Sequence, residues 1–172
     1  LNGNLERGTE RFLAIIGPSG SGKSSIAMAG LFPQLQNGAL PTSSTWTYLD
    51  PVLPGNHPID ELAAVLANRL NTSITTVKQD FEADVRGLHL RARQLVRRGD
   101  YVVLLVDQFE EVFTLTENKW ERDHFIELLA TAASEPNGSI ILVLTLRADF
   151  YGHPMVYPAL GQMLEQYSKS VL

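Results

Sequence analysis

The chain has 172 residues, 44% of them hydrophobic, and contains no cysteine. This size and hydrophobic content suit one globular domain with its own core, and the missing thiols exclude disulfide scaffolds and thiolate metal sites. A formal net charge of -5 gives no global field that favours nucleic acid, and no apolar run is long enough to span a bilayer. We therefore expect no clear nucleic-acid partner, no membrane partner and, from the absence of cysteine, a place in the reducing cytoplasm.

The first expected strand, residues 12–16, runs directly into a glycine-rich segment at residues 17–24. That segment has the phosphate-binding pattern G-x-x-x-x-G-K-[ST] and lies between a strand and a helix, as this chemistry requires. Glycines let the backbone adopt positive φ and come close to a ligand, so that its N–H groups can surround a polyphosphate. The helix that begins near Gly22 adds unpaired N–H groups and the positive end of its dipole.

Two side chains of this segment have expected roles in binding a nucleotide and its metal ion. Lys23 supplies a mobile positive charge for the β- and γ-phosphates, and the hydroxyl of Ser24 can coordinate Mg²⁺. Ser25 belongs to the expected binding segment, although its position favours an ordinary helix residue. The expected nucleotide-binding residues are Gly17, Pro18, Ser19, Gly20, Ser21, Gly22, Lys23, Ser24 and Ser25.

Four further apolar runs alternate with helical patterns along the rest of the chain, which is typical of a parallel sheet covered on both faces. We expect strands at residues 45–49, 101–106, 140–146 and 169–172. Apolar residues at helical spacing, with capping signals, predict helices at residues 59–70, 81–95, 125–132 and 158–167. The sequence therefore predicts one α/β domain over residues 1–172.

The expected strand at residues 101–106 ends in a carboxylate, Asp107. In P-loop proteins an Asp in this position lies beside the phosphate loop, where it can hold Mg²⁺. Asp107 is therefore the predicted metal residue, together with Ser24. An alternative is that Asp107 caps a helix, because Asp followed three residues later by Glu also suits a helix N-terminus.

Glu110 and Glu111 are both candidates for the residue that orients the attacking water. Many P-loop ATPases place Glu immediately after the metal Asp, but this chain has Gln108 there. A helix beginning near Gln108 would point the two glutamates about 100° apart, so that only one would face the γ-phosphate.

The expected strand at residues 140–146 ends in Arg147. A cation at the tip of a strand next to the phosphate loop can touch the γ-phosphate and report whether ATP or ADP is bound. The structural alternative for Arg147 is a salt bridge to Asp149 or Glu110.

Three segments together resemble the novel-STAND branch of the signal-transducing P-loop NTPases, which is related to NACHT proteins and apoptotic ATPases. They are residues 17–24 followed by AGLFP at 29–33, LVDQFEEVF at 105–113 and LTLRADFYG at 144–152. The resemblance implies a three-layer α/β/α sandwich with a mainly parallel five-stranded sheet in the order 5-1-4-3-2, its last strand incomplete. In this class the last acid of the pair, here Glu111, is commonly taken as the water-orienting residue, and Arg147 matches the arginine of a Thr-x-Arg motif.

The resemblance also implies a function. Members act as slow Mg²⁺-dependent ATPases that switch signalling proteins: ADP holds a closed monomer, and ATP permits assembly. The implied cofactors are ATP/ADP and Mg²⁺, and the implied partners are sensor or effector domains of the same polypeptide, such as WD repeats, and further copies in the ATP state. Because the sequence begins at Leu1 and has neither the upstream adenine-holding segment nor the winged-helix region of the class, we expect a piece of a longer protein.

Two other functions remain open from the sequence. A nucleotide-stabilised scaffold would bind ATP or ADP and recruit partners with little turnover. A small-molecule kinase would carry an arginine-bearing lid after the fourth strand, which the sequence does not show. ATP is favoured over GTP by default, since no Asn-Lys-x-Asp run that reads guanine is present.

Overall fold

A five-stranded sheet forms the centre of the computed structural model, which describes residues 11–171. Its strands lie in the order β2-β3-β4-β1-β5, and every neighbouring pair is parallel. This order confirms the predicted sheet. The strands are β1 (Phe12–Gly17), β2 (Thr47–Tyr48), β3 (Val102–Val106), β4 (Ile140–Arg147) and β5 (Ser168–Ser170).

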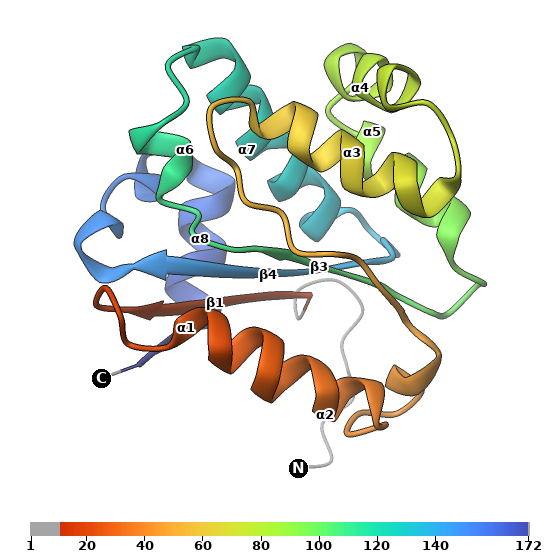
Figure 1. Ribbon diagram of the computed structural model, residues 1–172, viewed down its shortest axis with the longest axis horizontal. Coiled ribbons are helices and arrows are strands. Elements are labelled where there is room, and N and C mark those ends of the chain that lie inside the picture. The colour runs from red at the N-terminus through yellow and green to blue at the C-terminus, as the bar shows by residue number, and fades with distance from the viewer. Residues whose placement is uncertain (1–10, 172) are drawn as a thin grey trace.

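Helices cover both faces of the sheet, which gives the predicted three layers (Figure 1). One face carries a continuous helix built from α1 (Lys23–Ser25), a π-helical turn (Ile26–Leu31) and α2 (Phe32–Gln36). The opposite face carries α3 (Pro58–Leu70), α4 (Ile74–Ala83), α5 (Gly87–Ala92), α7 (Lys119–Ser134) and α8 (Pro158–Tyr167). The short helix α6 (Glu111–Thr114) and single 3₁₀ turns (Ser43–Thr45, Arg93–Leu95, Ala148–Phe150 and Pro154–Val156) complete the chain.

Strand β3 shows how the two faces share the core. Successive side chains of a strand point to opposite faces. Val102, Leu104 and Val106 therefore belong to the core cluster that includes side chains of α3, α7 and α8, whereas Val103 and Leu105 belong to the cluster that includes Ala27 and Phe32 of the helix after the phosphate loop. All five are fully buried, as expected of a strand covered on both sides. Within residues 11–171, no helix combines the length and apolar character needed to cross a membrane.

The π-helical turn has a local cause in Pro33. Proline has no backbone N–H and its ring clashes with the carbonyl four residues earlier, here that of Ala29. The helix widens just before it, and the N–H of Phe32 donates to the carbonyl of Ala27, five residues back. The helix thus continues through a proline without a break.

The single helix predicted at residues 81–95 is instead two helices, α4 and α5. The chain breaks at Asp84, whose backbone is extended and whose side chain accepts the N–H of Arg86 at 2.8 Å. Local bonds of this kind compete with helix formation. The second helix then returns close to the first at Gly87. A Cβ on this residue would lie only 2.6 Å from the carbonyl oxygen of Asp80.

Two strands differ slightly from their predicted ranges. Strand β2 is shorter than the predicted 45–49 because Thr45 belongs to a 3₁₀ turn, in which its hydroxyl donates to the carbonyl of Thr42 at 2.8 Å. The strand predicted at 169–172 is observed as β5, which begins one residue earlier and ends at Ser170. Leu172 lies outside the described residues.

A buried histidine on α5 makes stability depend on pH. His89 is 2% exposed, and its Nδ1 has no hydrogen-bond partner. Burial lowers the pKa of His89, and it outweighs the nearby Glu135, which acts to raise the pKa. The folded state therefore favours the neutral ring, while the unfolded chain protonates near the ordinary value.

We predict that the free energy of unfolding falls as pH drops below about 6.5, because the unfolded chain then binds a proton that folded His89 excludes. The slope reaches at most about 1.4 kcal/mol per pH unit for this one proton. Urea unfolding between roughly pH 7 and pH 5 would measure it. His89→Gln should have a shallower slope than the wild type; equal slopes would show that His89 does not carry the effect.

Candidate nucleotide-binding site

The phosphate loop connects the end of β1 to α1 and has the backbone that its glycines permit. Gly20 and Gly22 have φ values of +75° and +80°, in the left-handed region that glycine adopts without strain. Gly17 is needed for space instead, since a Cβ there would lie 2.7 Å from the Ser21 Oγ and 2.8 Å from the Val171 carbonyl oxygen. The predicted glycines therefore serve two different purposes.

The side chain of Lys23 folds back over this loop. Its Nζ donates to the carbonyl oxygens of Gly17 at 3.1 Å and Pro18 at 2.7 Å, and the residue is only 8% exposed. Inside the loop, the buried Oγ of Ser21 has no hydrogen-bond partner. A buried cation and an unpartnered hydroxyl in a glycine-rich loop suit an anionic ligand.

Asp107 joins β3 to the phosphate loop. Its Oδ1 accepts a hydrogen bond from Ser24 Oγ at 2.7 Å and another from the hydroxyl of Thr145 on β4. Thr145 Oγ1 also accepts the N–H of Gln108 at 2.8 Å. The Asp107 carboxylate therefore bonds to α1 and β4 and does not cap α6, which begins only at Glu111.

The oxygen donors of the site suit Mg²⁺, which takes few protein ligands, better than a metal ion bound entirely by protein side chains. Within residues 11–171, no three His, Cys, Asp or Glu side chains gather as metal ligands. Mg²⁺ commonly binds through one or two protein oxygens, water and the phosphates of its nucleotide. The Ser24 hydroxyl and the Asp107 carboxylate, already in contact, supply oxygens of this kind.

The two candidate glutamates leave the turn after β3 in different directions. The helix expected from Gln108 is wrong, because Gln108 has φ +54° and helix α6 starts three residues later. Glu110 is buried, and its Oε2 accepts the N–H of Arg147 at 3.2 Å. Glu111 Oε2 accepts the N–H of Gly55 at 3.0 Å, in the loop between β2 and α3.

Arg147 ends β4 directly beside the phosphate loop, as the register partner of Gly17. Its guanidinium forms a two-point ion pair with Asp149, at 3.1 and 2.6 Å, and lies over the ring of Phe150 at 5.2 Å. The paired hydrogen bonds raise the pKa of Arg147 and lower that of Asp149. The salt bridge named as the alternative for Arg147 is thus present, with Asp149 as its partner.

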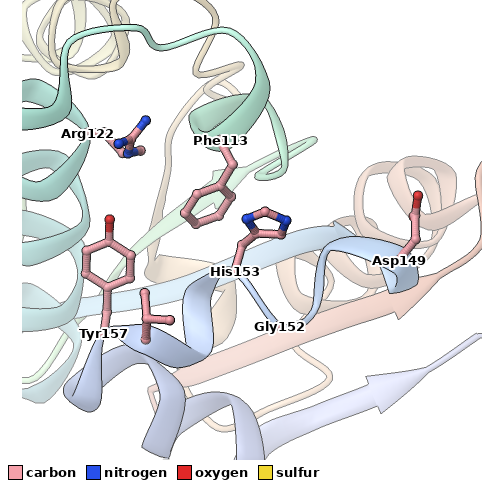
Figure 2. Close-up of a pocket in the computed structure, with 7 residues that line it drawn as sticks. Phe113, Arg122, Asp149, Gly152, His153 and Tyr157 are labelled. Carbon is pink, nitrogen blue, oxygen red and sulfur yellow. The ribbon is translucent and has the colours of Figure 1, made fainter.

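An open pocket of about 570 Å³ adjoins Asp149. Figure 2 shows the ring of His153 between Phe113 on α6 and the chain at Gly152, with Tyr157 and Arg122 further along the wall. The ring centroids of Phe113 and His153 are 5.3 Å apart. The pocket lining is Phe113, Arg122, Asp149, Gly152, His153, Val156 and Tyr157.

Thr145 and Gly55 are site residues to which the sequence analysis assigned no role of their own. Thr145 had a signal, since it is the one hydroxyl in the otherwise aliphatic run of residues 140–146. A fully buried hydroxyl in such a run must find partners, and here they are Asp107 and Gln108. Gly55 had no such signal, because its contact with Glu111 depends on how the loop after β2 folds.

Known proteins share the fold of this chain. A search of curated proteins gave no match. Among solved structures, the chain is similar to the Aeropyrum pernix ORC2 protein in ADPNP-ADP complexes, with a TM-score of 0.53 and 12% identity over 93% of this chain and 41% of that one. It is also similar to the cytoplasmic domain of the Thermomonospora curvata type VII secretion ATPase EccC, with a TM-score of 0.50 and 16% identity over 94% of this chain and 19% of that one.

At these identities the two structures support the fold alone, and the chain spans less than half the length of either. The family comparison goes further, because the model of Novel STAND NTPase 1 matches residues 2–172. That range includes the phosphate loop, Asp107 and Arg147. The chain belongs to the Novel STAND NTPase 1 family.

Proposed function

We propose that this NTPase domain binds ATP with Mg²⁺, hydrolyses it slowly and acts as an ATP/ADP switch in a larger signal-transduction protein of the cytoplasm. The observation that carries the proposal is the pair of contacts across the phosphate loop. Lys23 Nζ lies on the loop carbonyls of Gly17 and Pro18, and Ser24 Oγ lies on the Asp107 carboxylate. These contacts place the Lys23 ammonium and the oxygens of Ser24 and Asp107 at the same loop.

Each part of the site has a distinct task in this proposal. The loop amides and the Lys23 ammonium would bind the β- and γ-phosphates, because both present positive charge to the same space. Ser24 and Asp107 would hold Mg²⁺, which supplies charge neutralisation on those phosphates when it is bound. Ser19 is exposed in the loop, and Ser25 is exposed at the end of α1.

Arg147 is the proposed sensor of the γ-phosphate. Its position beside Gly17 brings it to the phosphate loop, and its ion pair with Asp149 is partly exposed. A γ-phosphate could compete with Asp149 for the guanidinium, because both are anions that pair with two N–H groups of arginine. ATP and ADP would then differ in whether Asp149 keeps its partner. The partners of the switch would be sensor or effector domains of the same polypeptide and, with ATP bound, further copies of the protein.

We predict that Lys23→Ala removes the rise in melting temperature that Mg-ATP gives. Ligand at about 100 times its Kd stabilises the folded state by about 2.7 kcal/mol. That corresponds to roughly 5–10 °C in a domain of this size. Lys119→Ala, on the exposed surface of α7, is the matched control and should keep the full rise. Differential scanning calorimetry of each variant with and without nucleotide measures it, and an unchanged rise in Lys23→Ala would contradict the site.

We predict that Asp107→Asn weakens the Mg²⁺ dependence of ATP binding more than it weakens binding of ADP without metal. Asparagine keeps an oxygen that can accept from Ser24, so the fold should persist while the charge for the cation is lost. The Mg²⁺ concentration needed for half-maximal ATP binding should rise by about tenfold or more. Isothermal titration calorimetry at a series of Mg²⁺ concentrations tests this. If the variant titrates like the wild type, Asp107 serves only to link β3 to α1.

A further inference from the structure

We propose that Glu110, and not Glu111, orients the attacking water, and that Glu111 instead fastens the loop between β2 and α3. This assignment rests on the proposed function and reverses the role that the family resemblance suggests. It comes from the strand order and from the hydrogen-bond partners of the two carboxylates.

The strand order places the phosphate loop on only one side of β3. Both glutamates follow β3, which lies between β2 and β4. The phosphate loop follows β1, and β1 lies on the far side of β4. A side chain that acts on the γ-phosphate must therefore reach toward β4, and one that reaches toward β2 points away from the phosphate loop.

Glu110 reaches toward the phosphate loop. Its Oε2 accepts the N–H of Arg147, and Arg147 is the register partner of Gly17, the first residue of the loop. The residue is 7% exposed, so its carboxylate is held in one place by its surroundings. Its second oxygen, Oε1, makes no hydrogen bond to residues 11–171 and can accept one from water. The same holds for Glu111 Oε1, so the direction of each side chain is what separates the two roles.

Glu111 reaches the other way. Its Oε2 accepts the N–H of Gly55, and the Gly55 carbonyl accepts the hydroxyl of Thr116, each at 3.0 Å. Glu111 and Thr116 thus hold both peptide groups of Gly55. The loop itself continues the β2 side of the sheet, because Val52 pairs with the end of β3. Its N–H donates to the carbonyl of Leu105 and its carbonyl accepts the N–H of Asp107, both at 2.9 Å. To act on a phosphate, Glu111 would have to release this amide.

Single-turnover ATP hydrolysis by the full-length protein with Mg²⁺, measured beside ATP affinity, tests the assignment. Glu110→Gln should keep ATP affinity within about threefold and lower the hydrolysis rate by about 100-fold or more, since the positioned base is lost. Glu111→Gln should keep the rate within about threefold, because its amide oxygen can still accept from Gly55. Glu127→Gln, on the exposed surface of α7, is the matched control.

Hydrogen exchange gives a readout that does not depend on turnover. Glu111→Ala should speed exchange of the Gly55 amide by about tenfold or more, whereas Glu110→Ala should leave it unchanged. The assignment would be overturned if Glu111→Gln lost ATP hydrolysis while Glu110→Gln kept it, or if both variants lost it equally. If the wild type binds ATP without turnover, the proposed hydrolysis and the role of Glu110 fall together, while the exchange result still decides the role of Glu111.

Discussion

The hydrogen bonds to the Asp107 carboxylate are the constraint on which the rest of the site depends. Asp107 is 6% exposed, and its carboxylate needs partners because an unpaired buried charge is costly. Its partners come from two other elements, Ser24 on α1 and Thr145 on β4. One oxygen therefore links the end of β3 to β4 and to the helix that follows the phosphate loop.

The same contacts shape the turn that carries the two glutamates. Gln108 has φ +54°, a conformation that costs a residue with a side chain roughly 1–2 kcal/mol. Thr145 offsets this cost by accepting the N–H of Gln108 at its hydroxyl and that of Phe109 at its carbonyl. The chain consequently turns before helix α6 begins, and Glu110 and Glu111 leave it toward opposite neighbours of β3.

Features that depend on local residue types were predictable from the sequence, and features that depend on a distant partner were not. The phosphate loop follows from its glycines and Lys23, and the strands follow from their apolar runs. The break at Asp84 comes from one side-chain bond that the apolar periodicity of 81–95 conceals. The direction of each glutamate depends on Gly55 and Arg147, which are far away in the sequence and meet these side chains only in the folded sheet.

Arg147 connects these observations, because its backbone and side chain contact different acids. Its N–H holds Glu110, and its guanidinium holds Asp149 at the edge of the pocket in Figure 2. A ligand that drew the guanidinium from Asp149 would free a carboxylate facing that pocket while leaving the backbone bond to Glu110 in place. The proposed water-orienting acid and the proposed sensing ion pair thus use different groups of one residue at the tip of β4.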